Sequence, residues 1–509
     1  MLSNLIVMNT DAVASWVKKV RIQEEIDRYL LNGKDFIDDA AIAHTLLQNK
    51  NAPASQIRDI LQKSLSIHIL APKETAALLN VESPELWEEI FDTALRVKKK
   101  VYDNRIVFFA PLYCANYCVN NCAYCGFRAD NRLEKRRILT FDEIKRETSS
   151  VLNEGHKRLV LVFGEHPLTD IDYISEAVKS VYSVTEPAPI SGKPSRIRRV
   201  NINAAPMDIA KLRILKKAGI GTYQVFQETY HHNTYATVHP ANTVKGDYRW
   251  RLYSLHRAME AGIDDVAIGT LFGLYDWRFE VMGLLHHALD LERQFGVGPH
   301  TISFPRLTPA SGSWLSSNSA YKVSDDDFKK LVAVLRLSVP TAGMIVTARE
   351  KADIKREIIK LGCTQTDAST RIGIGAYSDQ KTETDLDKKQ FTIGDPRDLD
   401  DVIREMAQMG FISSFCTAGY RCGRTGKTIM GLLSHCEEGK FCKLNAVLTF
   451  REYLSDYASK ETREIGEPLI QQEIDEIESQ EYFLRRPAQL KKFHQQYEEI
   501  VSGVRDLYL

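Results

Sequence analysis

Short apolar runs alternate with longer amphipathic stretches over most of the chain after residue 105. The runs have the length of strands, and the stretches between them repeat apolar residues at helical spacing. Such alternation is typical of βα units, in which helices connect parallel strands. The strand-like runs are 105–112, 158–163, 196–203, 222–227, 265–270, 300–304, 343–347 and 364–368. Together they predict a complete (βα)8 barrel of the TIM type, with an open α/β sheet as the alternative.

Capping signals between the runs support this interpretation. Thr140 and Glu143 have the spacing of a capping box, and Ser324 and Asp327 have the spacing of an N-cap and its third helical residue. In both places an amphipathic stretch follows at once. The sequence therefore predicts a helix after each of these caps.

The helical and βα patterns divide the chain into three parts. Residues 1–100 are charged and helical in pattern, and their last stretch begins at Pro84. Residues 101–394 contain the predicted barrel. Residues 395–509 contain the last barrel helix and a C-terminal region.

Composition narrows the class of partner. The chain has 44% apolar and 26% charged residues, as in a globular domain, and its 67 Lys and Arg balance 67 Asp and Glu. Such a balance predicts neither a nucleic acid nor an anionic membrane as partner. No apolar run approaches 18 residues, and no basic region precedes the apolar start. We therefore expect a cytoplasmic protein, and the nine clustered cysteines fit a reducing compartment.

One loop after the first predicted strand carries three cysteines. Cys118, Cys122 and Cys125 have Cys-x3-Cys-x2-Cys spacing. Three thiolates hold three corners of a 4Fe-4S cluster, which leaves the fourth iron open. A structural zinc site is the alternative, but such sites close with a second cysteine pair or histidines, and the loop has neither.

This loop resembles that of radical S-adenosylmethionine (SAM) enzymes. The resemblance implies a 4Fe-4S cluster whose open iron binds SAM and passes one electron to it, yielding a 5′-deoxyadenosyl radical. Tyr124 would then pack against the adenine of SAM, with a core tyrosine as the alternative. The loop lies where a barrel gathers its chemistry, at the carboxyl end of a strand.

A second cysteine group follows the barrel and makes the resemblance more specific. It contains Cys416, Cys422, Cys436 and Cys442. With this group the chain resembles the HydG family of tyrosine lyases, which mature FeFe-hydrogenase, and less closely the ThiH lyases of the thiamine pathway. The resemblance extends over nearly the whole chain and includes the segments 104–107, 223–231, 271–276 and 297–303.

HydG-type chains hold an auxiliary iron-sulfur cluster in a C-terminal Cys-x2-Cys-x22-Cys motif. Cys416 and Cys442 match its first and third positions, but Gly419 occupies the second and has no ligand atom. Cys422, Cys436 or a small molecule would have to substitute, or the cluster would be smaller. The alternatives are a site without metal and a zinc site of four cysteines.

The resemblance also assigns residues to SAM. Gly164 and Glu165, after the second predicted strand, fall where radical SAM barrels bind the amino group of SAM. For Glu165 a surface position at a helix start is the alternative. Gln227 and Glu228 end the fourth strand and are further SAM-side candidates. Arg251 is another, with an ion pair on its own helix as the alternative.

Substrate and auxiliary-site residues are implied in the same way. Thr347 and Arg349 match the family's Ser/Thr-x-Arg, whose arginine grips the carboxylate of tyrosine. A surface ion pair is the alternative for Arg349. His287 corresponds to a histidine that binds the labile iron of the auxiliary cluster, and the adjacent His286 leaves open which of the two faces inward. A satisfied core histidine is the alternative.

The implied reaction is cleavage of the Cα–Cβ bond of L-tyrosine to p-cresol and dehydroglycine by a radical SAM lyase. Onward conversion to carbon monoxide and cyanide on iron would serve assembly of the hydrogenase H-cluster. The alternatives are a ThiH-like lyase that stops at dehydroglycine or acts on another aromatic amino acid, and a non-catalytic iron-sulfur carrier. The expected partners are SAM, L-tyrosine, an electron donor and hydrogenase maturation proteins.

Overall fold

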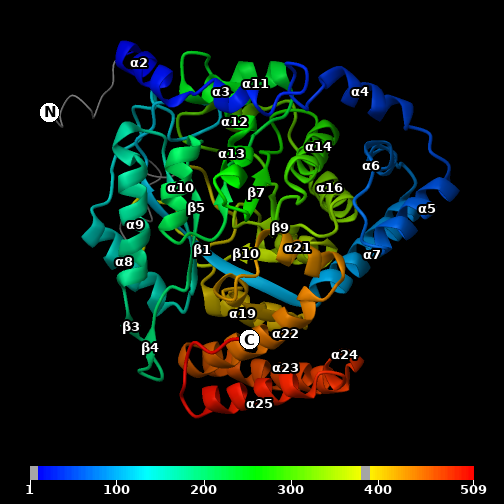
Figure 1. The fold of residues 1–509 in the computed structure, drawn as a ribbon, viewed down its shortest axis with the longest axis vertical. Helices are drawn as coiled ribbons and strands as arrows, with labels where there is room; N and C mark the ends of the chain where they lie inside the picture. Colours follow the sequence, from blue (N-terminus) through cyan, green and yellow to red (C-terminus); the bar gives the residue numbers. More distant parts are fainter. Residues whose placement is uncertain (1–9, 380–389) are drawn as a thin grey trace.

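A closed barrel of parallel strands forms the centre of the computed structural model, which describes residues 10–379 and 390–509 (Figure 1). The strands pair in chain order, and the last pairs back with the first, Val107 opposite Gln365 and Phe109 opposite Asp367. The barrel strands are β1 (Arg105–Ala115), β2 (Arg158–Phe163), β5 (Arg199–Asn203), β6 (Tyr223–Gln224), β7 (Val266–Gly269), β8 (Thr301–Ser303), β9 (Gly343–Val346) and β10 (Gln365–Asp367). Each overlaps one predicted run, so the (βα)8 barrel is confirmed.

Helices surround the barrel and follow its strands. They are α8 (Phe141–Asn153), α9 (Ile171–Ser183), α10 (Ile209–Lys217), α13 (Ser254–Glu260), α14 (Trp277–Phe295), α16 (Asp325–Ser338), α17 (Ala352–Leu361) and α19 (Leu399–Gln408). Before α8 the predicted capping box is present, because the Glu143 side chain accepts the Thr140 amide at 2.7 Å and the Thr140 hydroxyl accepts the Glu143 amide. Ser324 caps α16 in the same way through the amide of Asp327. Minor elements between strands are β3 (Glu186–Pro187), β4 (Pro194–Ser195), α11 (His232–Val238), α12 (Tyr248–Leu252) and α15 (Trp314–Asn318).

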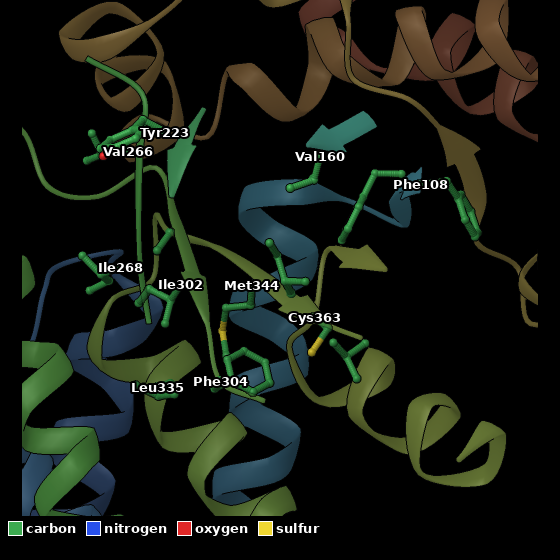
Figure 2. Packing of buried hydrophobic residues seen from close by; sticks show 14 of the residues in the cluster. Phe108, Val160, Tyr223, Val266, Ile268, Ile302, Phe304, Leu335, Met344 and Cys363 are labelled. Atoms are coloured by element: carbon green, nitrogen blue, oxygen red, sulfur yellow. The ribbon is translucent and has the colours of Figure 1, made fainter. Parts of the chain in front are cut away.

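Side chains from alternate strand positions pack between the barrel and these helices. Phe108, Ile302 and Met344 are fully buried, and Figure 2 shows Ile302, Phe304 and Met344 close to Leu335 of α16. This is the period-2 arrangement of strand side chains, which leaves every second residue for the barrel axis. Residues on the axis therefore decide what the barrel encloses.

The N-terminal part is helical, as its pattern predicts. It comprises α2 (Thr10–Val20), α3 (Glu24–Asp27), α4 (Asp39–Gln48), α5 (Ala54–Leu65), α6 (Pro72–Leu79) and α7 (Pro84–Tyr102). The first two helices cross the barrel end at which α11 and α12 lie, and the last two pack beside α14 and α16 (Figure 1). None of the helices within residues 10–379 and 390–509 has the length and apolar composition needed to cross a membrane.

The C-terminal part begins with a strand that the sequence pattern did not predict. β11 (Ile412–Ser414) pairs with the first residues of β1, Arg105 opposite Ile412. After it come α20 (Ala418–Arg421), α21 (Gly426–Ser434), α22 (Glu438–Asp456), α23 (Lys460–Ser479), α24 (Glu481–Leu484) and α25 (Pro487–Val501). Helices α22 to α25 form a layer at the end of the barrel opposite to α2 (Figure 1).

Arg336 of α16 connects two loops at that end of the barrel. Its guanidinium is fully buried and donates to the carbonyl oxygens of Pro340 and Ala342 at 2.9 and 2.8 Å and of Gly362 at 2.8 Å. These carbonyls precede β9 and β10. The arginine therefore fixes the start of both strands.

Replacing Arg336 with leucine leaves three buried carbonyls without this donor. We expect Arg336→Leu to lower the free energy of unfolding by about 3 kcal/mol, since each unsatisfied buried group costs roughly 1–3 kcal/mol. Thermal unfolding of the variant, followed by circular dichroism, measures the effect. Among residues 10–379 and 390–509 the exposed Arg96 forms an ion pair with Asp92 on its own helix and with no other residue, so Arg96→Leu is the control. Equal melting temperatures for Arg336→Leu and wild type would contradict the role.

Candidate active site

A large cavity opens at the carboxyl ends of the barrel strands. Most of the predicted site residues line it together: Cys118, Cys122, Tyr124, Cys125, Gly164, Glu165, Glu228, Arg251, Thr347 and Arg349. They come from the loops after β1, β2, β6 and β9 and from α12. This is the end of a (βα)8 barrel where catalytic groups gather.

The cysteine loop presents its three sulfurs to this cavity. Asn120 Nδ2 lies 3.7 Å from Cys118 Sγ, and Gln390 Nε2 lies 3.6 Å from Cys125 Sγ. Burial raises the pKa of Cys118 and takes that of Cys122 to about 12. Buried thiols of this kind become thiolates when a positive centre binds them, and the amide donors suit sulfurs that carry negative charge. The donor set therefore fits an iron-sulfur cluster.

Gly164 fits β2 closely against the cysteine loop. A Cβ atom at this position would lie 2.1 Å from the carbonyl oxygen of Tyr117, so only glycine is accommodated. The Gly164 amide donates to Ala115 O at 3.0 Å, and the Val119 amide donates to Glu165 O at 2.9 Å. The Glu165 carboxylate accepts the side-chain amide of Asn120, and burial raises its pKa. Glu165 is thus held beside the cluster loop and is not a surface residue.

Glu228 carries the ionised carboxylate of the site. It accepts from Lys245 Nζ at 2.7 Å and from Arg251 Nη2 at 3.2 Å. Burial acts to raise its pKa, but the two cations outweigh burial and hold the pKa below its usual range. The ion pair of Arg251 is therefore with an acid of the cavity wall and not with one on its own helix.

The backbone at Glu228 is in the left-handed region, with φ of 73°. Its carbonyl accepts from the Leu271 amide at 2.8 Å and from the Thr270 hydroxyl at 2.6 Å. The buried carboxylate of Glu280 accepts the hydroxyl of Thr229 and, at 2.8 Å, the amide of Tyr230. Such conformations persist only when surrounding contacts hold them, and these bonds fix the two residues that follow Glu228.

Tyr124 contributes an aromatic face beside the cysteines. Its hydroxyl lies 2.9 Å from His239 Nε2, and the Lys245 ammonium lies 5.4 Å from its ring centre. It packs with Leu274 and with Leu271, which lines the cavity. An aromatic ring with an apolar surround suits a planar base such as adenine.

Arg349 offers an anion site across the cavity. Its guanidinium stacks on Phe391, 3.2 Å from the ring centre, and donates to Thr308 Oγ1 at 3.1 Å. Within the described residues it has no ion pair, and burial lowers its pKa. The hydroxyl of Thr347 is likewise buried without a hydrogen-bond partner among those residues. Together they can hold a carboxylate that enters the cavity.

The structure corrects the expectation for Gln227. Its side-chain amide turns toward Tyr248 O, at 3.5 Å, and it does not line the cavity. Gln224, Phe226 and Glu228 do line it, because residues two apart along an extended segment share a face. Gln227 lies between two of these residues, so its side chain points to the opposite face. Gln224 is one of the cavity residues that sequence reasoning missed, although the alternation carries the signal.

His287 is also misplaced by the sequence interpretation. Its Nδ1 lies 2.9 Å from the Tyr230 hydroxyl, and its ring packs with Phe36 and His256 among the surrounding helices. These contacts are those of a core histidine. The adjacent His286 is half-buried on the same helix.

A second site lies at the other end of the barrel. Cys416, which follows β11 and has φ of 48°, is hydrogen bonded to Cys442 of α22. That bond, together with Arg105, Arg199 and Arg158, holds the pKa of Cys416 well below its ordinary value. The two sulfurs thus lie together and one is held as the thiolate that metals require.

The remaining cysteines do not complete this site. Gly419 lines the small pocket with Cys416 and Cys442, whereas Cys422 is exposed and its sulfur lies 3.8 Å from Leu509 O. Cys436 is half-buried and does not line the pocket either. Neither Cys422 nor Cys436, the two cysteines offered as substitutes for the missing ligand, lines the pocket in this structure.

His300, immediately before β8, is a histidine near Cys416. It is buried beside Asp265, Arg199 and Cys416, and its Nδ1 has no hydrogen-bond partner among the described residues. Burial lowers its pKa, which favours the neutral imidazole that binds metals. The sequence showed this histidine only as the first residue of a strand.

Polar side chains occupy the barrel axis between the two ends. Asn203, Gln224, Ser303 and Asp367 line the upper cavity, and Asn201, Thr301 and Gln365 lie below them, all buried or half-buried. Barrel interiors of this type are ordinarily filled by Val, Ile and Leu. Here Gln365 accepts from Arg158 at 3.0 Å and donates to Thr301 at 3.3 Å, so hydrogen bonds cross the axis.

Comparisons with known proteins agree with this arrangement. A model of the radical SAM superfamily matches residues 112–283, and one of the biotin and thiamin synthesis associated domain matches residues 303–412. The 2-iminoacetate synthase of Escherichia coli is 28% identical over 352 residues, which are 69% of this chain and 88% of that protein.

Two solved structures cover almost the whole chain. HydG of Carboxydothermus hydrogenoformans is 33% identical with a TM-score of 0.74 and spans 96% of this chain and 99% of that one. Another crystal structure of HydG, a maturase of the [FeFe]-hydrogenase, is 42% identical with a TM-score of 0.87 and spans 93% of this chain and 100% of that one. The chain therefore belongs to the HydG family of radical SAM lyases.

Proposed function

We propose that this enzyme cleaves the Cα–Cβ bond of L-tyrosine to p-cresol and dehydroglycine. The observation that carries the proposal is Arg349, a buried cation without an ion pair among the described residues, which faces the cavity shared with the three cysteines. A free amino acid supplies the carboxylate that this cation lacks. Similarity to 2-iminoacetate synthase supports the same product, because dehydroglycine is 2-iminoacetate.

Each group in the cavity has a role in this reaction. When bound, the cluster and SAM supply the 5′-deoxyadenosyl radical that takes a hydrogen atom from the amino group of tyrosine. Glu165 and Glu228 offer carboxylates to the polar groups of SAM, and Lys245 and Arg251 keep Glu228 ionised. Arg349 and Thr347 hold the tyrosine carboxylate, which fixes its amino group toward the cysteine side. The closed barrel excludes water from the radical.

We propose further that dehydroglycine is converted to carbon monoxide and cyanide for assembly of the hydrogenase active site. Support comes from the Cys416–Cys442 pair, from His300 beside it and from the polar barrel axis. Maturation proteins of the hydrogenase would be the partners. The second candidate is a lyase that stops at dehydroglycine, which Gly419 and the exposed Cys422 favour.

Incubation of the reduced, reconstituted enzyme with SAM and tyrosine tests the lyase. We expect 5′-deoxyadenosine and p-cresol, detected by chromatography. In Arg349→Lys the charge remains but the bidentate grip on the carboxylate is lost. We therefore expect kcat/KM for tyrosine to fall roughly 100-fold, with a higher KM and less p-cresol formed per 5′-deoxyadenosine. Iron content should match wild type. A variant that forms p-cresol at the wild-type rate would remove Arg349 from the site.

Glu280 is expected to impose a pH dependence on stability. Burial raises its pKa from the ordinary 4.5 to about 7, so the folded chain keeps a proton that the unfolded chain releases. The stability that this proton contributes is complete below pH 4.5 and is lost progressively as the pH rises to about 7.

Thermal unfolding of wild type and Glu280→Gln at pH 5.5 and 7.5 checks this expectation. The amide does not titrate, so the advantage of wild type over the variant should shrink at the higher pH. An advantage that stays constant or grows would show that Glu280 is ionised throughout. The KM for SAM should rise in the variant, because glutamine keeps only one acceptor oxygen where Glu280 offers separate oxygens to Thr229 and Tyr230.

Iron counts distinguish an enzyme that makes carbon monoxide and cyanide from a lyase that stops at dehydroglycine. In Cys416→Ala and Cys442→Ala we expect fewer iron atoms per reconstituted chain and no infrared bands of bound carbon monoxide or cyanide, while p-cresol is still formed. Cys422→Ala is the matched control, since its sulfur lies outside the pocket. Unchanged iron in both of the first two variants would rule out an auxiliary cluster there.

A further inference from the structure

The proposed reaction requires one electron from outside the protein for each SAM that is cleaved. We propose that an acidic one-electron carrier protein docks on the surface formed by Arg128, Arg132, Leu133, Lys135 and Trp314, here termed the docking surface. This inference rests on the proposed function for its electron demand. Its geometry rests on two loops that contact each other beside the cluster loop.

The docking surface backs directly onto the peptides between the cluster cysteines. Asn131 Nδ2 donates to Gly126 O at 2.8 Å and to Ser311 O at 3.0 Å, and so joins the loop after Cys125 to the loop before α15. From that second loop, Ser313 Oγ donates to Ala123 O at 2.7 Å. Gly126 and Ala123 each follow a cluster cysteine. A carrier seated here is therefore brought close to the cluster.

Two large apolar side chains stand out from these loops. Leu133 is 63% exposed and Trp314 is 74% exposed. Each lies one or two residues from the anchored Asn131 and Ser313. Tryptophan and arginine are enriched at the energetic centres of protein interfaces, and electron-transfer complexes need only small patches. A rigid backbone that displays both residue types fits a transient complex.

Local charge selects an acidic partner. Residues 128–137 contain five Lys and Arg against two acids, although the whole chain is balanced at 67 each. Of the two acids, Asp130 pairs with Arg128, and Glu134 is buried and accepts the Asn116 side-chain amide. Arg137 pairs with Glu143, so the excess positive charge of this segment comes from Arg132 and Arg136, which have no ion pair among the described residues. This charge attracts an acidic carrier at low ionic strength.

The experiment compares two reductants on the reconstituted full-length enzyme. Bleaching of cluster absorbance is followed by stopped flow, with either dithionite or reduced flavodoxin, an acidic flavin carrier, at low ionic strength. Dithionite is small and needs no docking surface. In Arg132→Glu/Trp314→Ala we expect the flavodoxin rate constant to fall roughly tenfold or more and the dithionite rate to stay unchanged. Added salt should slow wild type more than the variant.

A matched control lies on α24 and its C-cap, in the C-terminal helical layer. Leu484 is 59% exposed and the Arg485 side chain 74%, so Leu484→Ala/Arg485→Glu likewise truncates an exposed apolar side chain and reverses one charge, far from the cluster. Where a variant also reacts more slowly with dithionite, the ratio of its flavodoxin rate constant to its dithionite rate constant is compared with that of wild type. An unchanged ratio in Arg132→Glu/Trp314→Ala, or an equal fall in the control, overturns the proposal.

Two further outcomes are kept separate. If wild type sediments as a dimer and Arg132→Glu/Trp314→Ala as a monomer, a second copy occupies the docking surface and the proposal fails. The reduction is measured before SAM and tyrosine are added. Absence of p-cresol in the later assay would therefore refute the lyase without touching the docking result, and an unchanged ratio would refute docking without touching the lyase.

Discussion

The pairing of β1 with β10 closes the barrel, and both candidate sites depend on this closure. β1 is eleven residues long and has neighbours along its length: it pairs with β11 at residues 105–107, with β10 at residues 107–109 and with β2 from Ala110 onward. Its first residue, Arg105, lies beside Cys416, and the cysteine loop begins just beyond its last. Without the closing pairs β10 would be a free sheet edge, and Arg349 would follow the strand next to that edge. The closure places it across one cavity from Cys118.

Burial of charge distinguishes the two cysteine sites. At the carboxyl ends of the strands, burial raises the pKa of the Cys118 and Cys122 thiols and keeps them neutral. The cations there, Lys245 and Arg251, form ion pairs with Glu228. At the other end three arginines surround Cys416 and favour its thiolate. Desolvated charges are costly unless a partner compensates them. The thiols of the first site therefore become negative only when a positive centre binds them. At the second site the Cys416 sulfur is already a thiolate before anything binds.

The sequence was sufficient for the barrel because strand-length runs alternate with capped amphipathic stretches, although β10 itself is polar. It was insufficient for β11, which has only three residues and gains its pairing from β1. Glu165 and Glu228 were identified by their positions after strands. Gln227 and His287 failed for a common reason: proximity along the chain does not say which face a side chain takes. His300 is recognised as a site residue only when β8 is placed beside the loop after β11.

Gly419 affects the second site through the backbone as well as through its missing sulfur. It lies in α20, a helix of four residues, and Cys422 is the C-cap of that helix. The bonds from Cys422 N to Ala418 O and from Arg424 N to Gly419 O hold the turn that keeps the Cys422 sulfur exposed. Glycine within a helix costs about 1 kcal/mol relative to alanine, and a single turn has little cooperative stability. The residue that lacks a ligand atom thus also weakens the turn that keeps the nearest spare thiol away.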